Sequence, residues 1–133
     1  MDIIYRLLVA GGIMAIIDLF WLSTVANKFY KSQIGPLLLD KPNMVAAAIF
    51  YVIYVIGIVA FVVSPALEKS SWHHAVIYGA LFGLVAYATY DLTNLATLKG
   101  FTNKLVVVDL LWGTILTATV SVSTYLVIQK WLS

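Results

Sequence analysis

The sequence predicts an all-α protein, a single antiparallel bundle of four transmembrane helices. Of its 133 residues, 62% are hydrophobic and only 11% are charged, whereas a soluble domain of this size needs more charge to cover its surface. The apolar residues form four stretches, each long enough to cross a hydrocarbon core of about 30 Å with roughly 20 helical residues. Each stretch is continuous, which argues against the alternating strands of a small β-barrel. The expected surroundings are therefore a lipid bilayer.

The four predicted spans cover about residues 3–26, 44–64, 75–98 and 105–129. Turn-forming pairs, Gly35-Pro36, Lys41-Pro42 and Ser64-Pro65, lie between the first three spans. Loop one lies between the first and second spans, loop two between the second and third, and loop three between the third and fourth. Loops two and three are short, so each joins adjacent antiparallel helices. No flexible linker divides the chain, and we expect one domain over residues 1–133.

Aromatic residues stand near the predicted ends of the helices, and they are Tyr30, Trp72, Phe101 and Trp131. Such residues are typical of the aromatic belts that form at membrane interfaces. In loop one, the apolar Leu37-Leu38-Leu39 segment is expected to lie along the interface rather than in water.

Lysine and arginine are distributed unevenly between the two sides of the predicted bundle. Loops one and three share one side and hold Lys28, Lys31, Lys41, Lys99 and Lys104. The other side holds only Arg6, Lys69 and Lys130. The positive-inside rule therefore predicts that loops one and three are cytoplasmic and that both termini lie outside.

Asp18, Asp91 and Asp109 lie within the predicted spans, whereas no basic residue lies in the middle of a span. A charge at the bilayer centre costs about 2.5 kcal/mol or more, and a short aspartate cannot snorkel to the surface as lysine does. Counting about 1.5 Å per helical residue from the span ends places all three in the same half of the bilayer, near loops one and three. Tyr51 and Tyr54 on the second span lie at comparable depth. We therefore expect one polar layer.

Each of these aspartates is followed three positions later by a residue with an N–H donor, namely Trp21, Asn94 and Trp112. Helical spacing puts the donor close to the same face as its aspartate, and Tyr87 extends this face of the third span. Gly79 and Gly83 form a Gly-x-x-x-Gly pattern that favours close helix packing. The predicted ligand-binding residues are Asp18, Trp21, Tyr51, Tyr54, Tyr87, Asp91, Asn94, Asp109 and Trp112.

Two segments of the sequence are similar to a known family. Residues 90–100 read Tyr-Asp-Leu-Thr-Asn-Leu-Ala-Thr-Leu-Lys-Gly, and residues 108–113 read Val-Asp-Leu-Leu-Trp-Gly. They resemble an uncharacterised bacterial membrane family, domain of unknown function 2177, whose first helix the Asp18-to-Trp21 element also resembles. The family usually has Trp after Lys-Gly, where this chain has Phe101. The resemblance covers nearly the whole chain and implies a four-helix protein of the bacterial inner membrane, with no established activity.

Three functional hypotheses are compatible with a layer of intramembrane carboxylates. The favoured one is a pocket that binds or transports a proton, a cation or a small cationic or amphipathic molecule, because carboxylates without basic partners attract cations. Tyr51, Tyr54, Trp21 and Trp112 would add cation–π contacts. Small four-helix multidrug exporters likewise embed one acid in their first helix, but this is an analogy of architecture only. The alternatives are an enzyme acting on a lipid or isoprenoid with the aspartates as acid and base, and a purely structural role as hydrogen-bonded glue between helices.

Other functions have little support in the sequence. A net charge of +2 with no basic run does not predict a nucleic-acid partner. His73 and His74 lie on the side opposite the aspartates, so no metal site is predicted, and no catalytic residue or cofactor is assigned. A bundle this small often needs a second subunit to enclose a cavity, which makes a homodimer a reasonable expectation.

Overall fold

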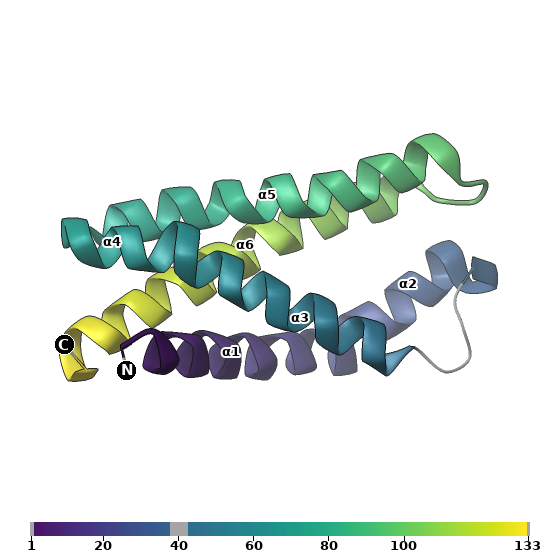
Figure 1. Ribbon diagram of the computed structural model, residues 1–133. Helices are drawn as coiled ribbons and strands as arrows, with labels where there is room; N and C mark the ends of the chain where they lie inside the picture. Colours follow the sequence, from purple (N-terminus) through teal and green to yellow (C-terminus); the bar gives the residue numbers. More distant parts are fainter. Residues whose placement is uncertain (1, 38–42, 133) are drawn as a thin grey trace.

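The computed structural model describes residues 2–37 and 43–132, which form four long helical rods (Figure 1). The first rod comprises α1 (Asp2–Trp21), the π-helical turn η1 (Leu22–Ala26), α2 (Asn27–Ile34) and the 3₁₀ turn η2 (Gly35–Leu37). The second comprises α3 (Met44–Ile58), the π-helical turn η3 (Val59–Val63) and α4 (Ser64–Lys69). The third is α5 (Trp72–Thr97), and the fourth is α6 (Asn103–Val127) followed by the π-helical turn η4 (Ile128–Leu132).

All four rods are long and apolar enough to cross a membrane, over Ile3–Leu37, Met44–Lys69, Trp72–Thr97 and Asn103–Trp131. Both chain termini and the junction of α4 with α5 lie at one end of the bundle, and α2 and the α5–α6 turn lie at the other (Figure 1). Consecutive rods therefore run in opposite directions. The predicted fold class, a four-helix antiparallel transmembrane bundle, is confirmed.

The first helix does not end near Ala26 but continues to Leu37. Its continuation is amphipathic. Ile34 packs there with Phe101, Leu105 and Val106 at the end of the bundle opposite the termini. The π-helical turn η1 joins the two parts, and the hydroxyls of its Ser23 and Thr24 donate to the Phe20 carbonyl oxygen of α1. Packing against other helices thus keeps a polar segment helical where composition alone suggests a loop.

The longer helix corrects the interpretation of two aromatic residues as interfacial. Phe101 is only 8% exposed, and Tyr30 packs in the same cluster. Trp72 and Trp131 are exposed, as an interfacial belt requires. Of the Leu37-Leu38-Leu39 segment, only Leu37 belongs to the described residues, and Lys41-Pro42 also lies outside them.

The two ends of the bundle pack differently. Near the termini, α1, α3, η3 and α6 share a hydrophobic core built from Ala10, Met14, Tyr54, Val55, Ile58, Val59, Val63, Leu116 and Val120. At the same end, Arg6 donates a hydrogen bond of 2.7 Å to the Ser64 hydroxyl and ties α1 to α4. At the other end, residues 43–50 at the start of α3 are all exposed. The bundle is therefore closed near the termini and less closely packed along the first half of α3.

Glycines allow α5 and α6 to pack in close contact. A Cβ atom on Gly79 would lie 2.7 Å from the Ser121 Oγ atom. A Cβ on Gly83 would overlap the carbonyl oxygen of Gly113, and one on Gly113 would overlap the ring of Tyr87. The Gly-x-x-x-Gly pattern thus serves helix packing, and this seam fixes α5 and α6 relative to each other.

We expect Gly83→Ala to destabilise the protein by about 1–3 kcal/mol, because the added methyl group must displace the backbone of α6. Gly12→Ala is the matched control, since nothing lies within 4 Å of a Cβ at Gly12, and it should change stability by no more than about 1 kcal/mol. Denaturant unfolding of both purified variants in the same detergent measures the difference. Equal stabilities would show that the seam does not need glycine.

Candidate functional site

The three intramembrane aspartates come together at the end of the bundle that holds α2 and the α5–α6 turn. Asp109 on α6 interacts electrostatically with Asp91 on α5 and with Asp18 on α1. Three helices thus contribute one carboxyl group each to a single cluster. We refer to Asp18, Asp91 and Asp109 as the carboxylate cluster.

Asp91 is the most deeply buried member of the carboxylate cluster. It is 1% exposed, and neither of its side-chain oxygens has a hydrogen-bond partner among the described residues. Asn94, the donor predicted for it one turn further along α5, makes no side-chain hydrogen bond to the part of the chain that the structure describes. The expected Asp91–Asn94 pairing is therefore absent from the described residues. A buried carboxyl group without a donor is uncommon and needs a physical explanation.

Asp109 is held by a residue that the sequence did not single out as part of the site. The Tyr30 hydroxyl on α2 donates a hydrogen bond of 2.5 Å to Asp109 Oδ1. Sequence analysis missed Tyr30 because residues 27–34 were expected to form a loop. The signal was the spacing of Ala26, Tyr30 and Ile34, which recur every four residues and predict one apolar face of a continuing helix.

Two tryptophans join α1 to α6 beside the carboxylate cluster. The rings of Trp21 and Trp112 stack with their centroids 4.2 Å apart and their planes 10° from parallel. The Trp112 indole N–H lies near the carboxyl group of Asp18, so this predicted donor is placed beside the aspartate of the neighbouring helix. The Trp21 N–H lies near the Tyr30 hydroxyl without reaching hydrogen-bonding geometry. Of the predicted donors, Trp112 lies beside an aspartate of another helix, whereas Trp21 and Asn94 make no side-chain hydrogen bond to the described residues.

The three predicted tyrosines have different roles in the structure. Tyr51 donates a hydrogen bond of 2.7 Å to the Gly11 carbonyl oxygen on α1. The Tyr54 hydroxyl is 2.6 Å from the Thr117 hydroxyl of α6, within the buried core. Tyr87 lies between these contacts and the carboxylate cluster and interacts with both Asp18 and Asp109.

Two hollows in the surface reach the carboxylate cluster. One, of about 390 Å³, is lined by Phe50, Ala86, Tyr87, Tyr90 and Asp109. The other, of about 330 Å³, is lined by Met14, Ala15, Asp18, Leu19, Leu22, Ala47, Phe50, Tyr51 and Tyr87. We call them the Asp109 hollow and the Asp18 hollow. Of the predicted site residues, only Asp18, Tyr51, Tyr87 and Asp109 line them.

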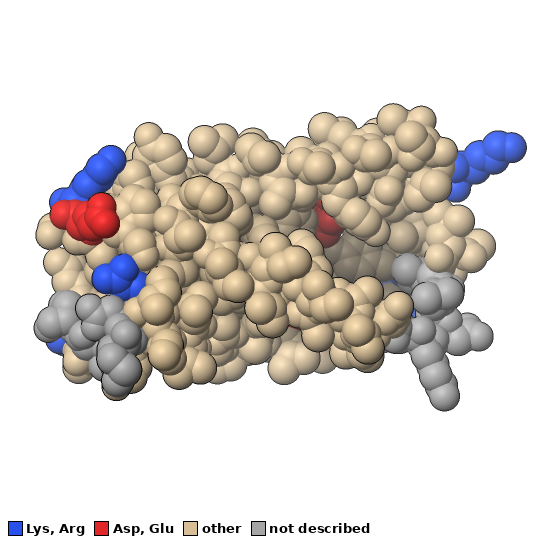
Figure 2. Space-filling model, viewed as in Figure 1, with Lys and Arg blue, Asp and Glu red and all other residues tan. Residues whose placement is uncertain are grey.

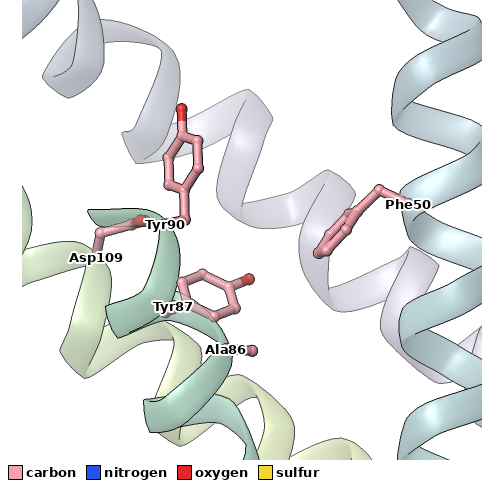
Figure 3. Close-up of a pocket in the computed structure, with 5 residues that line it drawn as sticks. All are labelled: Phe50, Ala86, Tyr87, Tyr90 and Asp109. Atoms are coloured by element: carbon pink, nitrogen blue, oxygen red, sulfur yellow. The ribbon is translucent and has the colours of Figure 1, made fainter. Parts of the chain in front are cut away.

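The hollows open beside the apolar residues 44–50 of α3, which are all exposed. In Figure 2, basic side chains appear only near the two ends of the bundle, and acidic atoms are visible inside a hollow nearer the middle. Figure 3 shows Phe50 on α3 facing Tyr87 and Tyr90 of α5 across the Asp109 hollow, with Asp109 on α6 at its side. Phe50 and Tyr90 were not predicted, because exposed aromatic residues in a transmembrane helix look the same in sequence whether they face lipid or a cavity.

The histidine pair lies at the other end of the bundle, at the start of α5. His73 stacks on Trp72, and His74 stacks on Tyr78, with ring centroids 3.7 and 4.2 Å apart, respectively. Among residues 2–37 and 43–132, no group of three or more His, Cys, Asp or Glu side chains is arranged to hold a metal ion.

Comparison with known proteins gives a family match. Residues 3–126 match the family described as "Predicted membrane protein (DUF2177)". No curated protein and no solved structure matches the chain.

The hydrogen bond from Tyr30 can be tested by removing one hydroxyl group. We expect Tyr30→Phe to lower the free energy of unfolding by about 1–3 kcal/mol, because Asp109 loses its donor in a buried setting. Tyr90→Phe is the control, since the Tyr90 hydroxyl makes no hydrogen bond to the described residues although its ring lines the same hollow. Thermal or denaturant unfolding in detergent measures both. A Tyr30→Phe protein as stable as the control would contradict the assignment.

Proposed function

The chain belongs to the DUF2177 family of predicted membrane proteins, and we propose that its carboxylate cluster is a membrane-embedded site that binds a cation in exchange with protons. The observation that carries this proposal is Asp91, a fully buried carboxyl group that has no hydrogen-bond donor among the described residues and lies beside a second carboxyl group. A group placed in this way needs a positive charge or a proton that the surrounding side chains do not supply.

The charge balance of the cluster supports cation binding. None of the three carboxyl groups is paired with Lys, Arg or His within the described part of the chain. Removing an ion from water costs several kcal/mol unless an opposite charge compensates, and two neighbouring carboxylates repel each other as well. The cluster is therefore favourable only when it holds a proton or another cation. Intramembrane acids in this situation are typically functional.

A purely structural role explains the arrangement less well. Interhelical hydrogen bonds in membranes contribute only about 0.6 kcal/mol on average, and Asp91 makes none with the described residues. The bundle already has other interhelical contacts, including Tyr51 with Gly11 and the glycine seam of α5 and α6. An acid at position 91 adds a desolvation cost without a structural hydrogen bond to offset it.

Protons and a cation would compete for the same carboxyl groups. Asp109 is faced by Tyr30 from α2, by Asp91 and Tyr87 from α5 and by Asp18 from α1, and none of these groups is a base that carries positive charge. Protonation of the cluster removes its negative charge, so lower pH should weaken cation binding and higher pH should strengthen it. A transporter uses such competition to couple cation movement to a proton gradient.

Uptake by proteoliposomes tests this function. We expect cation uptake driven by an imposed pH gradient to be lost in Asp91→Asn, because an amide cannot exchange a proton at this position. Glu68→Gln is the matched control, since Glu68 is an exposed acid at the opposite end of the bundle, and it should retain uptake. Uptake by Asp91→Asn at the wild-type rate, in protein of normal thermal stability, would rule out the proposed role of Asp91.

A lipid-modifying enzyme is a second candidate, favoured by one observation. Two neighbouring carboxyl groups can divide the roles of general acid and general base, and the Asp109 hollow opens beside the exposed apolar start of α3, where a lipid or isoprenoid chain could reach Asp109. No nucleophile or cofactor is assigned to this reaction.

Lipid analysis distinguishes the two candidates. If the protein modifies a lipid, a deletion strain should accumulate an altered membrane lipid, and the wild-type gene but not the Asp109→Asn form should restore the normal profile. Transport predicts no new lipid species, so an unchanged profile would exclude the enzyme. Expression of the variant is checked in the same membranes by immunoblotting.

The location and orientation complete the proposal. We place the protein in the bacterial cytoplasmic membrane with loops one and three in the cytoplasm, because five basic residues lie on that side and three on the other. In this orientation the carboxylate cluster lies in the cytoplasmic half of the bilayer. The homodimer expected from the small size of the bundle, like the extent of the domain, stays a prediction.

A further inference from the structure

The Asp109 hollow and the Asp18 hollow adjoin each other along the first half of α3. They share Phe50 of α3 and Tyr87 of α5 in their walls. Each hollow ends at a different carboxyl group, and these two groups interact electrostatically with each other. The two hollows thus share two aromatic residues in their walls, and both reach the carboxylate cluster.

We infer that the two hollows form a single lateral site, open to the acyl chains of the bilayer, for an amphiphilic organic cation. This inference rests on the proposed function and specifies its ligand. The cationic centre would lie toward Asp109 and Asp18, and the apolar body would lie against Phe50, Tyr87 and Tyr90.

The water-facing end of the cluster is closed, which favours lateral access. Tyr30 covers Asp109 through their hydrogen bond, and Thr102 at the start of α6 donates to Gln33 of α2 over 2.6 Å. Beneath α2, Ile34 packs with Phe101, Leu105 and Val106 in a buried apolar cluster. A ligand arriving from the aqueous side would have to displace all of these contacts.

The flank beside α3, in contrast, is open. Residues 43–50 at the start of α3 are exposed, and Phe50 itself is 54% exposed although it lines both hollows. Tyr90 on the opposite wall is 62% exposed. Both side chains stand at the edge of the space seen in Figure 3, so a molecule dissolved among the acyl chains reaches Asp109 without crossing a packed layer.

The lining identifies the chemistry of the ligand. Apolar and aromatic side chains form most of both walls, and the charged groups are acidic. Aromatic faces attract cations, and the two hollows, of about 390 and 330 Å³, lie at the lower end of the range of roughly 300–1,000 Å³ that is typical of pockets for small organic ligands. A small hydrated ion would gain little from such walls, whereas a cation with an apolar body satisfies both parts of the site.

Binding to protein in lipid nanodiscs tests the inference with two probes of the same shape and opposite charge. We expect tetraphenylphosphonium to bind above the level of empty nanodiscs and tetraphenylborate not to do so. Asp109→Asn should weaken tetraphenylphosphonium binding at least about tenfold, and Phe50→Ala about five- to tenfold through the lost aromatic contact. Ile49→Ala is the matched control, because Ile49 is equally exposed on α3 but lines neither hollow, and it should change the Kd less than about twofold.

A filled hollow provides an independent test that leaves the acids in place. Ala86 lines the Asp109 hollow, so Ala86→Phe should abolish tetraphenylphosphonium binding, whereas Ala96→Phe on an exposed part of the same helix should not. Thermal unfolding confirms that both variants fold. Unchanged binding in folded Ala86→Phe, or equal effects of Phe50→Ala and Ile49→Ala, would overturn the inference.

The inference and the proposed function can fail separately. If tetraphenylphosphonium does not bind but pH-driven uptake of tetramethylammonium still depends on Asp91, the lateral site is wrong and the cation site stands. If neither tetraphenylphosphonium nor tetramethylammonium binds or is taken up, both are wrong.

Discussion

The structure depends on one constraint, the burial of acidic side chains among apolar helices with no basic partner in residues 2–37 and 43–132. Asp109 accepts a hydrogen bond from the Tyr30 hydroxyl of α2, and the Trp112 indole of α6 lies near Asp18 of α1. Asp91 has no hydrogen-bond donor among the described residues. Because charge in a low-dielectric setting must be compensated, these donors provide only part of what the three carboxyl groups need. The negative charge that these donors leave uncompensated makes the cluster a candidate binding site and not a set of structural contacts.

The two ends of the bundle pack differently, and this difference leaves an opening beside the buried carboxyl groups. Near the termini, α1, α3 and α6 bury a continuous apolar core, and glycines bring α5 against α6 so closely that a methyl group would collide. The close contact of α5 with α6 sets how near Asp91 and Asp109 lie on these adjacent helices. At the other end, the first half of α3 remains exposed, which leaves two hollows above the carboxyl groups. The bundle thus combines a closely packed end near the termini with an open flank along the first half of α3.

The helix α2 shows where local sequence is an incomplete guide. Residues 27–34 carry two lysines and precede a Gly-Pro pair, so their composition suggests a loop. They are helical because Ile34 and its neighbours pack on Phe101 and Leu105, residues nearly 70 positions away. Contacts of this kind cannot be read from local propensity, which tertiary packing routinely overrides. The consequence for the site is large, since the same segment supplies Tyr30.

The sequence by itself determined the four spans and their antiparallel order, and it predicted that the aspartates share one layer. These follow from hydrophobic length and from helical rise, which depend only on spacing along each segment. Only the tertiary structure decided which donor serves which acid, that Tyr54 contacts Thr117, and that Phe50 and Tyr90 line a hollow. The physical reason is that these features depend on how the helices are rotated and how far apart they lie. Neither quantity is encoded in the periodicity of a single helix that is apolar on every side.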